Sequence, residues 1–173
     1  AGTGLLKKFV TGEFTAQPQL LLNKNNSIYF VTLESEFNIY KIDTAGVITK
    51  LVSLPNSISS YDVDDNGLIF YISYNPNTQK HSLWRTDGTT NGTFMLTDKI
   101  YYNYGSVLRT AGNKAYFTAY DDKTGNELWA SDGTVAGTAL VKDIEKGTFG
   151  SSPFSLYPYK NYIVFGAFAY NGN

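Results

Sequence analysis

The sequence predicts an all-β protein, a segment of a β-propeller built from four-stranded antiparallel blades. The first support is a repeat, because residues 127–138 (ELWASDGTVAGT) and residues 82–93 (SLWRTDGTTNGT) match with a spacing of 45 residues. The second is composition: aromatic residues make up 16% of the chain and 16 glycines interrupt it, which favours strands and tight turns. The third is that short strands alternate with turns while no helical periodicity is sustained. Four short strands in about 45 residues are typical of a propeller blade.

In chain order, the repeat divides the sequence into five parts. Residues 1–10 are predicted to be the last strand of a preceding blade, because they align with the end of the repeat near Ile144. The remaining parts are three blades at 18–53, 58–100 and 105–145, followed by the first two strands of a further blade at 153–173.

Each unit begins with an apolar strand, a polar turn and an aromatic strand. In the second unit, residues 60–63 lead through the turn at 64–67 into the strand at 68–72. Asn and Gly in such turns favour hairpins because both tolerate positive φ. The aromatic strands are expected at 28–32, 68–72, 115–118 and 162–165.

The third strand of each unit carries the repeated motif, and a fourth strand follows it. In the first unit the motif is degenerate, with Tyr40 in place of the tryptophan and a fourth strand expected at 47–52. Strands carry adjacent apolar pairs such as Leu83-Trp84, which suits blades covered on both faces. Two interleaved anchors keep the period: Gly2, Gly46, Gly92 and Gly137 at spacings of 44, 46 and 45, and Phe30, Phe70, Phe117 and Phe165 at spacings of 40, 47 and 48.

The sequence reaches Asn173 one residue before the next copy of the motif is due, since Gly125-Asn126 precede the motif in the third unit. We therefore expect a piece of a longer repeat array, in which the rest of the same polypeptide completes the propeller. A closed four-bladed ring lacking one strand is the alternative. Blade faces and edges left open in such a piece need covering by neighbouring chain or by a partner.

Composition argues against several partners and chemistries. The net charge is −1 and only 17% of residues are charged, so we expect no nucleic-acid partner. No stretch approaches the roughly 20 apolar residues of a membrane-spanning helix, so we expect no membrane insertion. The chain has no cysteine, which removes disulfides, thiolate metal sites and cysteine nucleophiles together.

The motif resembles the ELWxSDGT-type repeats of large secreted or surface-anchored bacterial proteins. These are common in Bacteroidota and include proteins of gliding motility and type IX secretion. Residues 127–144 match the pattern closely, residues 82–100 match with Ser82 in place of Glu, and the unit at 38–52 departs widely. The resemblance implies a β-propeller exported to the cell surface and used as a scaffold, and it implies no enzymatic activity.

The motif residues are interpreted as structural. An Asp accepts backbone hydrogen bonds at a turn, a Gly takes positive φ, and flanking hydroxyls complete the loop. A catalytic carboxylate has no reason to recur every 45 residues. Tryptophans within strands favour the blade core over sugar stacking. This interpretation covers Asp87, Gly88, Asp132, Gly133, Trp84 and Trp129.

Residues 62–67 (DVDDNG) match the opening half of a calcium-binding loop, with ligands at alternate positions and a Gly at the sharp turn. The position of the bidentate Glu in such a loop is Ser73, which does not fill that role. The same residues also make an ordinary hairpin turn, and this is the preferred interpretation. Calcium binding by Asp62, Asp64 and Asn66 stays open.

Three further features are weighed. His81 is the only histidine and begins a strand, where exposure without function is expected. The tyrosine-rich segments 100–104 and 155–159 suit protein or glycan contact, although packing between blades is preferred. Residues 43–45 (DTA) resemble a short bacterial O-glycosylation acceptor, with Thr44 as the site.

The sequence therefore predicts a non-enzymatic extracellular propeller that mediates adhesion or protein docking, with no catalytic, cofactor or metal residues and no cofactor. A protein partner or a surface glycan is expected. The alternatives are a carbohydrate-binding propeller and the non-catalytic portion of a propeller enzyme whose active site lies outside this segment.

Overall fold

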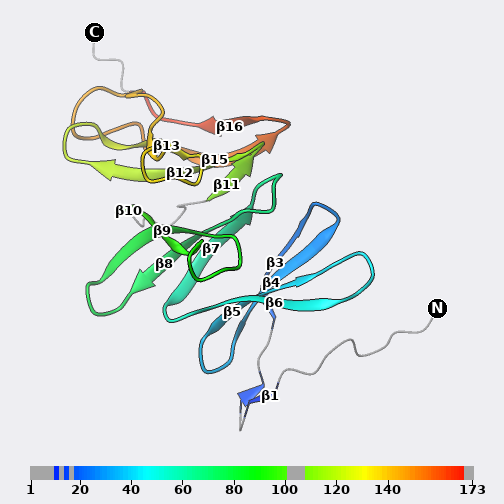
Figure 1. Cartoon of the computed structure of the whole chain (residues 1–173). Helices are drawn as coiled ribbons and strands as arrows, with labels where there is room; N and C mark the ends of the chain where they lie inside the picture. The colour runs from blue at the N-terminus through cyan, green and yellow to red at the C-terminus, as the bar shows by residue number, and fades with distance from the viewer. Residues whose placement is uncertain (1–9, 12–13, 16–17, 101–107, 170–173) are drawn as a thin grey trace.

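The computed structural model describes residues 10–11, 14–15, 18–100 and 108–169, in which every regular element is a β-strand. The strands form separate antiparallel sheets that follow one another along the chain, as Figure 1 shows. This confirms the predicted all-β architecture of four-stranded blades. The part of the chain that the structure describes contains no helix long and apolar enough to cross a membrane.

Three sheets have four strands each, and in each the strands neighbour one another in chain order. The first blade consists of β3 (Gln19–Lys24), β4 (Ser27–Leu33), β5 (Phe37–Ile42) and β6 (Ile48–Leu54). The second consists of β7 (Ser57–Val63), β8 (Ile69–Asn75), β9 (Lys80–Thr86) and β10 (Phe94–Ile100). The third consists of β11 (Arg109–Ala111), β12 (Lys114–Asp121), β13 (Gly125–Ser131) and β14 (Ala139–Leu140).

Two smaller sheets lie at either end of the described chain. A fourth, two-stranded unit pairs β15 (Phe154–Tyr159) with β16 (Tyr162–Gly166), and a short hairpin pairs β1 (Val10–Thr11) with β2 (Phe14–Thr15). Residues 1–9, most of the strand predicted at 1–10, lie outside the described residues. The fourth strand of the third blade is only two residues long, and beyond it the Val141 amide still donates a hydrogen bond to the Leu128 carbonyl of β13.

The cores lie between neighbouring blades, which is why both faces of a strand are apolar. One core joins Phe70 and Leu83 of the second blade to Phe117 and Trp129 of the third. The other joins residues of the first blade to residues of the second, with Ile39 and Ile69 almost fully buried. Within blades, aromatic residues on the second and third strands lie opposite one another, as Phe30 does with Tyr40, whose rings stack at 5.4 Å.

The first strands of successive blades contact one another: β3 contacts β7, β7 contacts β11, and β11 contacts β15. These inner strands therefore surround the axis about which the blades are arranged, while β6 and β10 lie at the outside of their sheets (Figure 1). The molecule is a partial β-propeller. Its channel side brings together strands that are far apart in sequence.

Candidate functional site

The repeated motif forms a closed turn that we call the clasp, comprising residues 131–138 in the third blade and 86–93 in the second. In the third blade, Asp132 Oδ1 accepts hydrogen bonds from the amide and the hydroxyl of Thr134, at 2.9 and 2.8 Å. The Thr134 hydroxyl in turn accepts from the Gly137 amide. The Thr138 hydroxyl donates to the Thr134 carbonyl and lies 2.7 Å from the Ser131 hydroxyl.

The second blade repeats this network contact for contact. Asp87 Oδ1 accepts from the amide and hydroxyl of Thr89, and the Thr89 hydroxyl accepts from the Gly92 amide. Thr93 closes the turn through the Thr89 carbonyl and the Thr86 hydroxyl. The carboxylates and hydroxyls of the motif are therefore used inside the turn, which confirms its structural interpretation.

A glycine is required at the far end of each clasp because it touches the aspartate. A Cβ added to Gly92 or Gly137 would lie 2.0 or 2.1 Å from the aspartate Oδ1. The threonine hydrogen bonds lower the pKa of Asp87 and of Asp132, with the hydroxyl contact as the largest cause. Both carboxyl groups therefore remain ionised at neutral pH.

The two tryptophans lie in the packed region of the blades, as expected. Trp129 is buried between the second and third blades, with the Lys99 ammonium 5.2 Å from the centre of its ring. Trp84 is half-buried, stacks on Tyr71 and donates to the Ser82 hydroxyl at 2.9 Å. The first blade has a different turn in place of the clasp: Asp43 accepts from the amides of Ala45 and Val47, and Thr44 is exposed.

The segment considered for calcium forms the hairpin between β7 and β8. Asp64 Oδ1 accepts from the amides of Asn66 and Leu68, and burial raises the pKa of Asp64. Asp62 accepts from the Val63 amide through Oδ1 and, across to the third blade, from the Thr110 amide through Oδ2 at 2.7 Å. Asp62 is thus an inter-blade link as well as part of the hairpin.

Two other residues singled out in the sequence are placed by the structure. Ser73 is buried in β8, opposite Ile58 of β7. His81 lies in β9, half-buried, with its ring 4.8 Å from that of Tyr74, and burial lowers its pKa. Among the described residues, no group of three or more His, Asp and Glu side chains is arranged to hold a metal ion.

Glu127, the first residue of the third motif copy, has a role that the sequence did not predict. Its side chain is fully buried, at 0% exposure. Oε1 accepts from the amides of Glu145 and Ser151, both at 3.0 Å, and Oε2 accepts from the Ser151 hydroxyl at 2.5 Å. Glu127 therefore fastens the connection between the third blade and β15 onto the end of β13.

Three of the four inner strands contain a β-bulge, in which one extra residue is inserted against the partner strand. The bulges lie between Gln19 and Leu22 in β3, between Ile58 and Ser60 in β7, and between Phe154 and Tyr157 in β15. Leu20 has a φ of 49° and Ser155 a φ of 54°, a conformation that costs a residue with a side chain about 1–2 kcal/mol. Bulges redirect side chains and are frequent beside functional sites.

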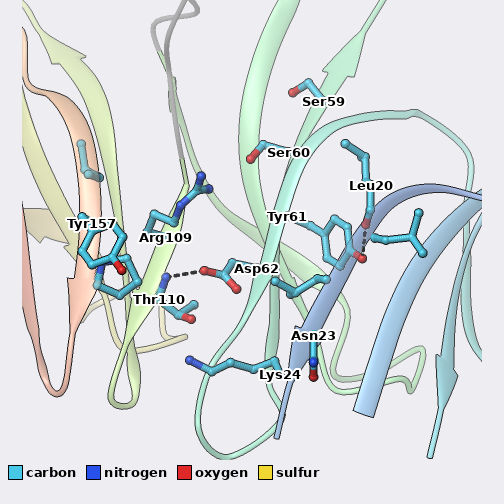
Figure 2. A pocket seen from close by; sticks show the side chains of 14 residues that line it. Leu20, Asn23, Lys24, Ser59, Ser60, Tyr61, Asp62, Arg109, Thr110 and Tyr157 are labelled. Carbon is cyan, nitrogen blue, oxygen red and sulfur yellow. Dashed lines mark hydrogen bonds between the residues drawn. The ribbon is translucent and has the colours of Figure 1, made fainter. Parts of the chain in front are cut away.

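These inner strands line a channel pocket of about 540 Å³. It lies between β3, β7, β11 and β15 and is shown in Figure 2. Leu20 and Leu21 of the β3 bulge line one side, and Tyr157 lines the other. The Tyr61 hydroxyl donates to the Leu20 carbonyl, which holds the bulge in place, and burial raises the pKa of Tyr61.

Arg109 lines this pocket and forms no ion pair with any described residue. Its side chain extends from β11 toward Ser60 on β7, as Figure 2 shows. Among the described residues, its one hydrogen bond runs from Nη1 to the Leu108 carbonyl at 2.8 Å. The remaining N–H groups of the guanidinium have no hydrogen-bond acceptor within the described ranges 18–100 and 108–169.

The tyrosine-rich segments fall into two cases. Tyr157 and Tyr159 on β15 are 69% and 58% exposed within this chain. Because β15 and β16 form the last sheet that the structure describes, their packing between blades stays a prediction. Of the segment 100–104, Ile100 is buried, and residues 101–104 lie outside the described residues. The exposed face of Tyr157 belongs to the channel pocket.

No protein-family model and no curated protein sequence matches the chain. Among solved structures, the chain is similar to TolB from Acinetobacter baumannii, with a TM-score of 0.57 and 15% identity over 86% of this chain and 36% of that one. It is also similar to an uncharacterized protein from Listeria monocytogenes EGD-e, with a TM-score of 0.53 and 15% identity over 73% of this chain and 40% of that one.

These similarities show the propeller fold. The chain spans less than half the length of either structure, so each resemblance concerns one portion of a larger protein.

Proposed function

We propose that this chain is a non-enzymatic propeller scaffold that docks another protein at the channel pocket. The observation that carries the proposal is the convergence of three bulged inner strands on one pocket. Leu21 of the β3 bulge is 69% exposed on one side of the pocket, and the equally exposed Tyr157 lies on the other side. Exposed leucine and tyrosine side chains on a rigid frame are suited to anchor a protein segment, because little conformational entropy is lost on binding.

The repeated motif supports a scaffold role. Its aspartates and threonines are hydrogen-bonded within each clasp, so the repeat supplies blade geometry and leaves recognition to other residues. The resemblance of the motif to ELWxSDGT-type repeats supports placing the scaffold on the outside of a bacterial cell, in adhesion, gliding motility or type IX secretion. Labelling of intact source cells with an antibody to this segment tests that location, and labelling only after permeabilisation contradicts it.

Docking at the pocket is tested by selecting binders from a displayed peptide library on the immobilised protein. We expect selected peptides to lose at least about tenfold in affinity for Leu21→Ser and Tyr157→Ala. Val135→Ser and Tyr162→Ala are matched controls, since both residues are exposed and outside the pocket. If no selected peptide distinguishes the pocket variants from the controls, protein docking at this site is refuted.

Carbohydrate binding is the second candidate, and Tyr157 is the observation that favours it. Its exposed ring offers a flat apolar surface in a pocket that also contains the polar groups of Arg109 and Asn23. A glycan array probed with the protein and with Tyr157→Ala tests this function. Glycans bound only by the unmodified protein would favour a sugar ligand over a protein segment.

A further inference from the structure

Three charged side chains line the channel pocket: Lys24, Asp62 and Arg109. Lys24 forms an ion pair, and Asp62 accepts hydrogen bonds through both carboxylate oxygens. The Lys24 ammonium lies 3.1 Å from Oδ1 of Asp65, a residue that does not line the pocket. Both oxygens of Asp62 accept backbone amide hydrogens, from Val63 and from Thr110. The guanidinium of Arg109 remains, with no carboxylate within salt-bridge distance among the described residues.

Arg109 is positioned to bind a carboxylate. A guanidinium presents five N–H donors in a planar fork that matches the two oxygens of a carboxylate. In the part of the chain that the structure describes, only Nη1 is engaged, by the neighbouring Leu108 carbonyl. Because Arg109 is partly buried in the wall of the pocket, a charge-assisted hydrogen bond there is stronger than one on the open surface.

The opposite wall of the pocket is apolar. Leu20 and Leu21 are exposed there, on the β3 bulge. A ligand that satisfies both walls needs a carboxylate with an aliphatic group a few ångströms away. Peptide segments supply this combination as a C-terminal leucine or as an acidic residue beside an aliphatic one.

We propose that the channel pocket binds the carboxylate of an acidic, aliphatic peptide segment, with Arg109 holding the carboxylate and the leucines of the β3 bulge contacting the aliphatic group. This inference rests on the proposed docking function and names the chemistry of its ligand. The Tyr61 hydrogen bond to the Leu20 carbonyl holds the apolar wall in position before the ligand arrives. Binding is expected to weaken as salt rises, because a charged contact is screened.

The proposal is tested with two small probes that differ only in the terminal group, the carboxylate of N-acetyl-leucine and the neutral amide of N-acetyl-leucinamide. Titrations followed by ¹H–¹⁵N NMR, including the Arg109 Nε–H signal, report both affinity and location. We expect the acid to bind with a dissociation constant on the order of millimolar and at least about tenfold more tightly than the amide, as expected for a hydrogen bond to a charged group. In Arg109→Gln the two probes are expected to bind within about twofold of each other.

Arg109→Lys is the second variant, because it keeps the charge and removes the planar fork; an intermediate preference for the acid is expected. Backbone spectra of both variants verify that the blades are intact. Equal binding of acid and amide by the unmodified protein, or an unchanged preference in Arg109→Gln, overturns the proposal. If the affinity of library peptides depends on Leu21 and Tyr157 while neither probe binds, protein docking is supported and carboxylate recognition is refuted. Glucuronic acid binding through Arg109 more tightly than N-acetyl-leucine would also overturn it, in favour of an acidic sugar.

Discussion

The second and third blades contain the same clasp but differ in the residue that begins the motif. Ser82 begins the second copy and Glu127 the third, two positions before the tryptophan in each case. The Ser82 hydroxyl accepts a hydrogen bond from the Trp84 indole within its own strand. The Glu127 carboxylate reaches residues 18 and 24 positions later in the chain.

The strands after the two clasps differ accordingly. β10 continues for seven residues along β9, whereas β14 pairs with β13 for only two. After β14, two separate hydrogen bonds hold the chain to β13: the Val141 amide donates to the Leu128 carbonyl, and the Ser152 amide donates to the Asn126 carbonyl. The clasp thus sets the turn within a blade, while the first residue of the motif sets how the connection to the next blade is held.

The largest predicted effect comes from removing the Glu127 side chain. Glu127→Ala removes the acceptor of the buried Ser151 amide and hydroxyl and of the half-buried Glu145 amide, and we expect it to lower the free energy of unfolding by about 3–5 kcal/mol. Ser82→Ala is the matched change in the second blade and removes one hydrogen bond, for an expected loss of about 1 kcal/mol. Urea unfolding measures both, and equal losses would contradict the difference between the blades.

The fold could be predicted from the sequence because the repeat reports on local backbone geometry. The residues of the clasp lie within eight positions of one another, so turn chemistry predicted that the Asp accepts a backbone hydrogen bond and that the Gly after it has positive φ. The 45-residue period and the short strands then predicted the blades. In such a repeat, each local preference agrees with the global arrangement.

The pocket and the Glu127 contacts could not be predicted in this way because they join distant positions. The pocket combines residues from Leu20 to Pro158, and no sequence pattern places Arg109 opposite the β3 bulge. The sequence shows that Ser82 and Glu127 occupy the same position of the motif, but it does not show that Glu127 contacts Ser151. Tyrosine content likewise did not reveal that Tyr157 faces solvent.

The next largest loss of stability is predicted for substitution of the clasp glycine, and it should be the same in the second and third blades. Gly92→Ala and Gly137→Ala each place a Cβ against an aspartate oxygen, and we expect losses of about 2 kcal/mol that agree within about 0.5 kcal/mol. Neither glycine has positive φ, so the effect is a steric one. In an Asp132→Ala background the cost of Gly137→Ala should shrink, and a double-mutant cycle by urea unfolding measures that coupling. Additive losses would show that the Gly–Asp contact is not the cause.

A smaller effect is expected at Arg85, which links the two clasps. Its Nε donates to the Gly92 carbonyl at 3.2 Å and its Nη1 to the Gly133 carbonyl of the next blade at 3.4 Å. Arg85→Ala should lower the free energy of unfolding by about 1 kcal/mol, because it removes these two long hydrogen bonds and the exposed 3.3 Å contact of Nη2 with Asp87 Oδ2. The corresponding residue of the third copy is Ala130, so Ala130→Ser serves as a control in which no contact between clasps is lost. A loss in Arg85→Ala no larger than in this control would exclude the link.

The smallest predicted effect is the pH dependence of stability that comes from Asp87 and Asp132, the aspartates of the two clasps. The threonine hydroxyls lower the pKa of Asp87 and Asp132 in the folded protein, so both groups bind protons more readily when the chain is unfolded. Their contribution to stability is therefore present above the unfolded aspartate value, near pH 4, and is lost as the pH falls through the folded pKa. NMR titration of the two side chains should place both below that value. Arg85→Ala should raise the pKa of Asp87 alone, because its guanidinium lies 3.3 Å from that carboxylate, whereas a shift of Asp132 as well would mean that the two clasps do not respond independently.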